Sequence, residues 1–109
     1  MDLIIDLVND KDKTIVNLSG EIDIYTAPKL KESLSPLAEY DGHLIEIDFE
    51  HVKYMDSTGL GVFIGILKST KEHNSHLKLV NLEESVLRLF KITGLDEIMD
   101  IHSIVRGGK

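Results

Sequence analysis

Cysteine is absent from this chain of 109 residues, which excludes disulfide bonds, thiolate metal sites and cysteine nucleophiles. Long apolar runs are missing too, because no stretch approaches the roughly 18 residues that a membrane-spanning helix needs. The opening residues Met1–Asp6 lack the basic start of a signal peptide, and Asp6 interrupts their apolar run. We therefore expect a cytoplasmic protein.

Positive charge is scarce. The 12 Lys and Arg side chains are outnumbered by 19 Asp and Glu, which gives a net charge of −7 at pH 7. Nucleic acids and anionic membranes attract clustered basic side chains, so neither is expected as a partner. Hydrophobic residues make up 42% of the chain, as in ordinary globular proteins. The length fits one domain over residues 1–109.

The first third of the chain predicts a hairpin followed by a helix. Leu3–Val8 and Thr14–Leu18 are rich in Ile, Val and Leu and are separated by a polar, turn-prone segment. Thr26 offers a side-chain oxygen to cap a helix, and Pro28 suits its first turn. Leucines then recur at helical spacing. Pro36 removes an amide donor within this pattern and should kink the helix or end it early.

A second strand and helix are predicted in the middle of the chain. Leu44–Phe49 alternates as a strand does, with one face formed by Ile45, Ile47 and Phe49 and the other by Leu44, Glu46 and Asp48. The helix that follows residues 55–59 is expected to bury one face through Leu60, Phe63, Ile64 and Leu67.

The last third predicts another strand and helix. Leu77–Val80 is an apolar run, and Asn81 with Glu84 three positions later matches a capping box for a third helix. Gly94 is typical of a helix end. The tail, Ile98–Val105, fits either a short strand or a helix, and its pattern leaves both open.

This order of elements, β-β-α-β-α-β-α, places the chain in the α/β class. Strands separated by helices are expected to be parallel through right-handed crossovers, and the opening hairpin adds an antiparallel pair. The result is one mixed sheet packed with helices. Periodicity alone does not tell whether the helices cover one face of the sheet or both.

The segment Met55–Gly65 is the most informative part of the sequence. A carboxylate and two hydroxyls lead into a helix that carries glycine at positions 59, 61 and 65. Each glycine in a helix interior costs about 1 kcal/mol relative to alanine. Gly61 and Gly65 lie four residues apart and form a stripe without side chains. Such a stripe allows close approach of another backbone, either from the domain's own sheet or from a partner.

Two interpretations of the hydroxyls in this segment are open. Asp or Ser before a helix is most often a simple N-cap. Alternatively, Ser57 is an exposed hydroxyl at a helix N-terminus, where amide donors and the helix dipole favour an anion. A phosphate added there would be locally stable.

Two segments together resemble the STAS family, and specifically the small bacterial anti-sigma factor antagonists. The segments are Asp56-Ser57-Thr58-Gly59-Leu60-Gly61 and Gly20-Glu21-Ile22-Asp23-Ile24-Tyr25-Thr26-Ala27-Pro28. Each alone would be a weak signal, but the combination at this spacing is specific. The similarity runs from the first strand to about Asp100.

The resemblance implies a regulatory protein without enzymatic activity or cofactor. In the family, the serine matching Ser57 is phosphorylated by an anti-sigma factor that is itself a serine kinase and binds the ATP. The unphosphorylated antagonist binds that factor and frees the sigma factor, and a phosphatase of the PP2C type resets the system. The residues implied as partner contacts or supports are Asp23, Asp56, Ser57, Thr58, Gly59 and Gly61.

Other functions remain as alternatives. A STAS scaffold subunit of a larger stress-signalling complex would be phosphorylated on Ser57 or Thr58. A nucleotide-binding enzyme could use the same loop, but the P-loop pattern of glycines with lysine is missing. Glu21 and Asp23 could pair as an acid and a base, although a solvated loop before a helix is the simpler interpretation.

Overall fold

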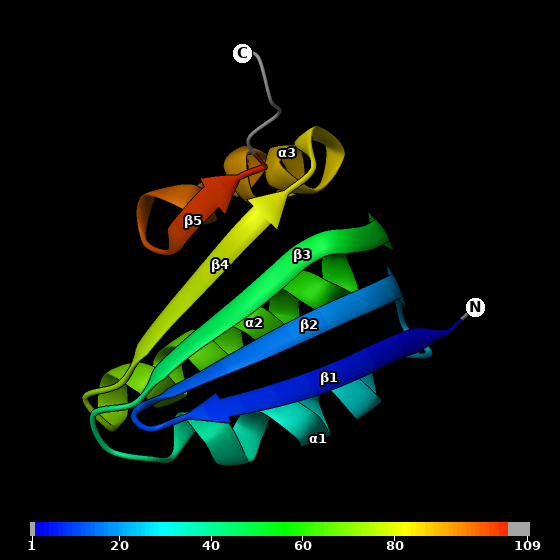
Figure 1. Cartoon of the computed structure of the whole chain (residues 1–109). Helices are drawn as coiled ribbons and strands as arrows, with labels where there is room; N and C mark the ends of the chain where they lie inside the picture. The colour runs from blue at the N-terminus through cyan, green and yellow to red at the C-terminus, as the bar shows by residue number, and fades with distance from the viewer. Residues whose placement is uncertain (1, 105–109) are drawn as a thin grey trace.

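The alternation expected from the sequence is present, with one further strand at the end. The computed structural model describes residues 2–104, and none of the helices within that range is long and apolar enough to cross a membrane. The elements are β1 (Leu3–Asp10), β2 (Lys13–Ile22), α1 (Ala27–Ala38), β3 (Leu44–Met55), α2 (Ser57–Glu72), β4 (His76–Leu82), α3 (Glu84–Ile92), the 3-10 turn η1 (Leu95–Glu97) and β5 (Asp100–Ser103) (Figure 1).

The five strands form one sheet in the order β1-β2-β3-β4-β5. β1 pairs with β2 antiparallel, and each later neighbour pairs in parallel, so the predicted mixed sheet is confirmed. The tail forms a strand, since residues 100–103 pair with β4. Val105 lies outside the described residues.

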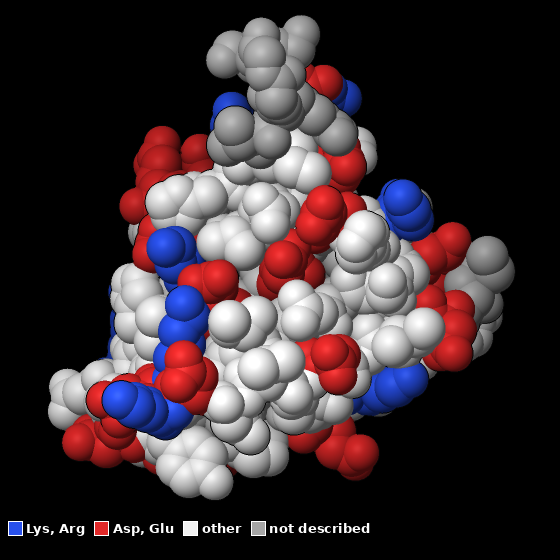
Figure 2. All heavy atoms as spheres, viewed as in Figure 1, with Lys and Arg blue, Asp and Glu red and all other residues white. Residues whose placement is uncertain are grey.

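The topology decides which face the helices cover. From β2 to β5 the chain always moves to the next strand in the same direction. Right-handed crossovers in a constant direction place every connecting helix on the same side of the sheet. Figure 1 shows α1 and α2 together behind the strands. The opposite side, called the open face below, carries no helix from the described part of the chain and is the side seen in Figure 2.

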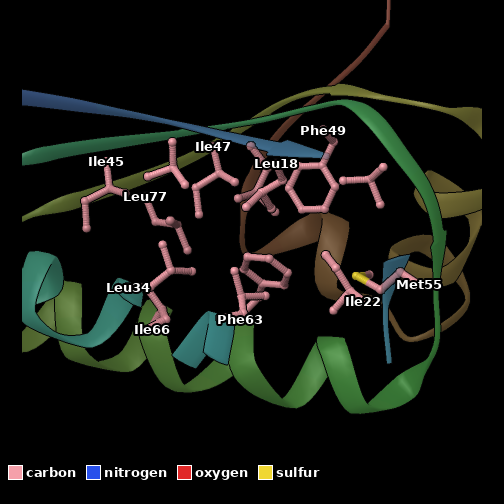
Figure 3. Close-up of a cluster of buried hydrophobic side chains, with 14 of the residues drawn as sticks. Leu18, Ile22, Leu34, Ile45, Ile47, Phe49, Met55, Phe63, Ile66 and Leu77 are labelled. Carbon is pink, nitrogen blue, oxygen red and sulfur yellow. The ribbon is translucent and has the colours of Figure 1, made fainter. Parts of the chain in front are cut away.

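The core lies between the sheet and its helices. Ile45, Ile47 and Phe49 of β3 are fully buried, which confirms the predicted strand face. Phe49 contacts Phe63 of α2, with ring centroids 5.3 Å apart (Figure 3). It also contacts Phe90 of α3, at 6.5 Å between centroids. Three aromatic rings therefore join α2 and α3 to the central strand.

α2 is rotated slightly from the predicted position. Leu60 and Phe63 are buried as expected, but the next buried apolar position is Ile66, and Ile64 and Leu67 are only half-buried. The helix continues to Glu72, and the hydroxyl of buried Thr70 donates to the Leu67 carbonyl at 2.7 Å, so this polar side chain is accommodated inside.

The predicted capping box at Asn81 is wrong. β4 runs on to Leu82, and Asn81 lies within it in a left-handed conformation with φ of 60°. The Asn81 amide donates to the Asp48 carboxylate of β3 at 3.1 Å, so a cross-strand contact holds the side chain. α3 begins after Glu83 instead. Its expected end is confirmed, because Gly94 has φ of 76° just beyond the helix.

α1 ends at Ala38, two residues beyond Pro36, and so tolerates the proline in its last turn. Its N-terminus differs from prediction. Thr26 occupies the N-cap position, but its side chain makes no capping hydrogen bond to the helix. The Thr26 hydroxyl turns back toward β2, and a neighbouring carboxylate accepts hydrogen bonds from the turn just before the helix.

Candidate functional site

The Ser57 segment, residues 55–61, begins where β3 ends. Asp56 keeps an extended backbone, and its carboxylate accepts a hydrogen bond from the Thr58 N–H at 2.9 Å. The Gly59 N–H also donates to the Asp56 carbonyl at 3.0 Å. Asp56 is therefore the N-cap of α2, the simpler of the two interpretations for this residue.

Ser57 and Thr58 are exposed at the first two positions of α2. Within residues 2–104 neither hydroxyl has a hydrogen-bond partner, so neither is committed to the fold. The first turn of α2 contains no acidic residue. The positive end of the helix dipole is thus compensated locally only by the Asp56 cap, and an added anion at this turn would be electrostatically favourable.

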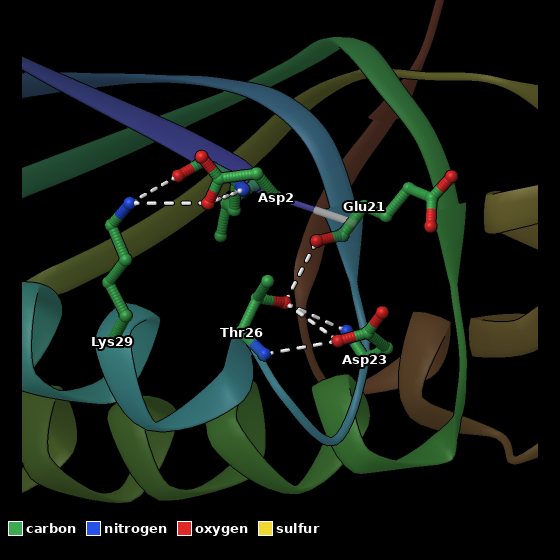
Figure 4. Close-up of polar contacts among 6 residues, drawn as sticks. Asp2, Glu21, Asp23, Thr26 and Lys29 are labelled. Carbon is green, nitrogen blue, oxygen red and sulfur yellow. Dashed lines mark hydrogen bonds and ion pairs between the residues drawn. The ribbon is translucent and has the colours of Figure 1, made fainter.

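The end of β2 lies against this segment. The Asp56 N–H donates to the carbonyl of Ile22 at 3.2 Å, although the two residues are far apart in sequence. The chain leaves β2 at Ile22 and forms the Asp23 loop, residues 23–26, before α1. The fold thus brings together the two segments that carry the family resemblance, and Figure 4 shows the Asp23 loop beside the first turns of α2.

Hydrogen bonds hold the Asp23 loop in one conformation (Figure 4). The Asp23 carboxylate accepts the N–H groups of Tyr25 at 2.9 Å and Thr26 at 3.0 Å. The Thr26 hydroxyl donates to the Glu21 carbonyl at 2.8 Å and accepts the Asp23 N–H at 2.9 Å. The Asp23 carboxylate therefore holds the turn that leads into α1, while Thr26 ties the loop back to β2.

The charge on Asp23 is stabilised by the same contacts. Partial desolvation raises the pKa of this carboxyl, but the N–H groups of Thr26 and Tyr25 and the Thr26 hydroxyl favour its ionised form. The pKa consequently lies below its ordinary value. An ionised Asp23 with a lowered pKa is a weak general base.

Two apolar side chains project from this loop. Ile24 is 65% exposed and Tyr25 is 84% exposed, although both are large. From the sequence, both residues stand only as members of the segment that carries the family resemblance, and neither has an assigned role. A signal was present, because both lie between a strand and a helix without belonging to the periodic pattern of either. Rigidly held, exposed apolar side chains are typical of interaction surfaces.

The three glycines at positions 59, 61 and 65 of α2 fall into two kinds. A Cβ at Gly59 would lie 2.7 Å from Cγ of Met55 and 2.8 Å from Cγ2 of Ile22, so its absence lets α2 approach the end of β2. At Gly61 and Gly65 a Cβ would meet nothing within 4 Å. The open stripe on α2 is therefore not used by the domain's own sheet.

Comparisons with known proteins agree with the family resemblance of the sequence. The model of the STAS domain family matches residues 5–107. The Anti-sigma-B factor antagonist of Bacillus subtilis is 48% identical over 108 residues, which cover 99% of this chain and 98% of that protein. The Anti-sigma-B factor antagonist of Listeria monocytogenes is 46% identical over 95 residues, covering 87% of this chain and 83% of the relative.

Solved structures share the fold. An anti-sigma factor antagonist from Mycobacterium paratuberculosis superimposes with a TM-score of 0.81 at 22% identity, covering 93% of this chain and 86% of the other. The Bacillus cell fate determinant SpoIIAA, solved in its phosphorylated form, has a TM-score of 0.70 at 20% identity, with 90% of both chains covered.

Proposed function

The chain belongs to the STAS domain family, and from this premise we propose that it is an anti-sigma factor antagonist that binds an anti-sigma factor. The observation that carries the proposal is the 48% identity to a curated antagonist over almost the full length of both chains. The match covers 98% of that relative, so nearly all of it has a counterpart in this chain. The protein acts by binding, not by catalysis.

The proposed contact surface combines the Ser57 segment with the Asp23 loop. Support comes from the Asp56–Ile22 hydrogen bond, which ties the Ser57 segment to the end of β2 where the loop begins, and from the exposed Ile24 and Tyr25 of the loop. A preorganised loop loses little conformational freedom on binding, so its contacts contribute more net affinity. Gly61 adds a position where a partner backbone can come close to α2.

In this proposal the switch is phosphorylation of Ser57. The anti-sigma factor binds ATP and acts as a serine kinase: the Ser57 oxygen attacks the γ-phosphorus, ADP leaves, and the hydroxyl proton passes to the kinase. A PP2C-type phosphatase later hydrolyses the phosphoserine. That SpoIIAA, a protein of the same fold, has a phosphorylated form is consistent with this chemistry.

The charge change is large enough to act as a switch without refolding. Phosphate adds about −1.5 to −2 charges. At the N-terminus of α2 this charge is tolerated within the domain, so the disruption is expected at the interface. A dianion desolvated against a partner, or near its carboxylates or nucleotide phosphates, costs several kcal/mol. A loss of about 4 kcal/mol weakens binding roughly a thousandfold.

The test uses the full chain and the anti-sigma factor purified from the same organism. Ser57→Asp is expected to abolish binding measured by titration calorimetry, and Ser57→Ala to bind normally but resist inactivation by ATP. Thr58→Val removes the neighbouring hydroxyl, and this variant should still be inactivated by ATP through Ser57. Tight binding by Ser57→Asp would contradict the charge-exclusion argument, and phosphate found by mass spectrometry on Thr58 instead would favour a scaffold subunit.

A second pair of variants tests the surface itself. Tyr25→Ser should weaken binding at least tenfold, because exposed tyrosines in rigid loops are frequent hot spots. Tyr40→Ser is the control, since Tyr40 is also an exposed tyrosine but follows α1 at its far end. Equal affinities for the two variants would place the partner elsewhere.

A further inference from the structure

β1 forms one edge of the sheet, and its outer side is open. Among residues 2–104, its one neighbour in the sheet is β2. The two strands pair over eight consecutive positions without a register shift, from Leu3 opposite Gly20 to Asp10 opposite Lys13. A long, regular edge strand presents a row of backbone groups that can pair with another extended chain.

The hydrogen bonds show which groups face outward. The Asp2 carbonyl accepts the Glu21 N–H, whereas the carbonyl of Leu3 accepts the ammonium of Lys29 from α1. Because antiparallel residues alternate between bonding inward and outward, the even-numbered residues of β1 pair with β2 and the odd-numbered ones point away. Leu3 is covered by Lys29 and by the Asp2 carboxylate, so the accessible edge runs from Ile5 to Asn9.

The side chains of β1 also favour a partner. Ile4 is 64% exposed, Leu7 42% and Val8 46%. Proteins often protect an edge with charged side chains, especially lysine, with proline or with a bulge; Leu3–Asp10 contains no lysine, proline or bulge, and its charged side chains are carboxylates. Carboxylates recur instead at every fourth position, at residues 2, 6 and 10, on the open face and alternating there with Ile4 and Val8.

The pattern of charge identifies the kind of occupant. Two copies paired along β1 would bring two rows of aspartates together without a compensating cation, and opposed like charges destabilise strand pairing. A strand with basic side chains opposite Asp6 and Asp10, alternating on that face with apolar ones, would neutralise the carboxylates and cover Val8. Figure 2 shows the same face with red carboxylates spread over it and blue basic groups mainly at its margins.

We propose that β1 is a docking edge for an extended segment of another protein, a segment whose side chains on the open face alternate between basic and apolar. The segment adds a sixth strand to the sheet: backbone bonds to Ile5, Leu7 and Asn9 give affinity, and the carboxylates give sequence preference. This edge is separate from the Ser57 segment, so docking does not depend on the state of Ser57.

The probe is an acetylated, amidated octapeptide of repeating Lys-Thr-Val-Thr, with a Glu-Thr-Val-Thr peptide as the matched control. Hydrogen exchange of the ¹⁵N-labelled full chain is followed by NMR. The basic peptide should slow the exchange of the amides of Ile5, Leu7 and Asn9 at least tenfold and leave Asp6 and Val8 unchanged. The acidic peptide should have no effect.

Two variants test the two parts of the proposal. Leu7→Pro removes an outward donor without breaking a bond to β2, and it should abolish protection by the basic peptide. Asp6→Lys retains the backbone and should reverse the preference toward the acidic peptide, which keeps the proposal testable even if the proline variant fails to fold. Glu32→Lys, an exposed charge reversal on α1, should change nothing.

Three outcomes would overturn the proposal. Unchanged exchange with the basic peptide would show that the edge does not accept a strand. Equal protection by both peptides would remove the role of the carboxylates. A dimer in sedimentation experiments, with the odd-numbered amides already protected and the dimer lost in Leu7→Pro, would show that a second copy covers β1.

Discussion

The three glycines of the α2 segment should respond differently to the same added methyl group. At Gly59 the new Cβ would lie 2.7–2.9 Å from atoms of Met55 and Ile22, closer than real Cβ contacts occur. Both neighbours are largely buried, at 7% and 0% exposure, so neither can move aside without disturbing the core. At Gly61 and Gly65 the Cβ would enter open space.

The two effects can be weighed against each other. Overpacking a well-packed core costs about 1–3 kcal/mol. Replacing glycine by alanine in a helix interior gains up to about 1 kcal/mol, and less near the helix start where Gly59 lies. Gly59→Ala should therefore lower the free energy of unfolding by about 1–2 kcal/mol, whereas Gly61→Ala and Gly65→Ala should each raise it by about 0.5–1 kcal/mol.

Urea denaturation followed by circular dichroism measures all three variants on one scale, with the slope m checked for constancy. The reasoning is refuted if Gly59→Ala is as stable as wild type, because Met55 and Ile22 would then yield freely. It is equally refuted if Gly61→Ala loses stability, because that position would then contact the domain after all. Binding adds a further distinction: Gly61→Ala should weaken anti-sigma factor binding although it stabilises the fold.

Three further predictions concern the core, the Asp23 loop and the edge at β5. Phe49→Ala should lower the free energy of unfolding, measured by urea denaturation, by about 3–5 kcal/mol, because Phe49 is fully buried and contacts two other rings. A loss below about 2 kcal/mol would contradict that packing. Thr26→Val should lower the free energy of unfolding by about 1–3 kcal/mol, because the Glu21 carbonyl and the Asp23 N–H lose their hydrogen-bond partner. The variant should also bind the anti-sigma factor more weakly, and a normal affinity would show that the loop lies outside the interface. Hydrogen bonding to His76, against opposing desolvation and aided by His102, holds the pKa of Asp100 below its ordinary value of 3.8. The stability that this carboxylate adds is fully present above pH 3.8 and is lost as the pH falls through the lowered pKa. The difference in melting temperature between wild type and Asp100→Asn should therefore shrink below pH 3.8. A difference that stays constant with pH would show that the charge plays no part.

Much of the fold follows from patterns that span only a few residues. The alternation of Ile45, Ile47 and Phe49 predicted the buried face of β3, and Gly94 predicted the end of α3. Residue type and spacing also identified Asp23 and Ser57 as candidate site residues. These features could be predicted because strand alternation, helix periodicity and turn chemistry depend on near neighbours in the chain.

Local patterns failed where a distant segment competes for the same group. The Asn81 amide matched a capping box, but Asp48, 33 residues away, holds it in β4. The Thr26 hydroxyl was expected to cap α1, but it donates to the Glu21 carbonyl, and the Asp23 carboxylate accepts the N–H groups of the turn before the helix. In both cases the residue was suited to the predicted role, and a stronger contact elsewhere decided the outcome.

By itself, the sequence determined the succession of elements, the residues of the Ser57 segment and the likeness to a family of regulators. The tertiary structure alone decided that all helices lie on one side of the sheet, that β1 remains an open edge, and that the Ser57 segment meets the Asp23 loop. It also separated Gly59, which lies against Ile22, from Gly61, which faces open space. The physical reason is that periodicity reports only which face of an element is apolar, whereas strand order and packing distance depend on atoms that the chain brings together from far apart.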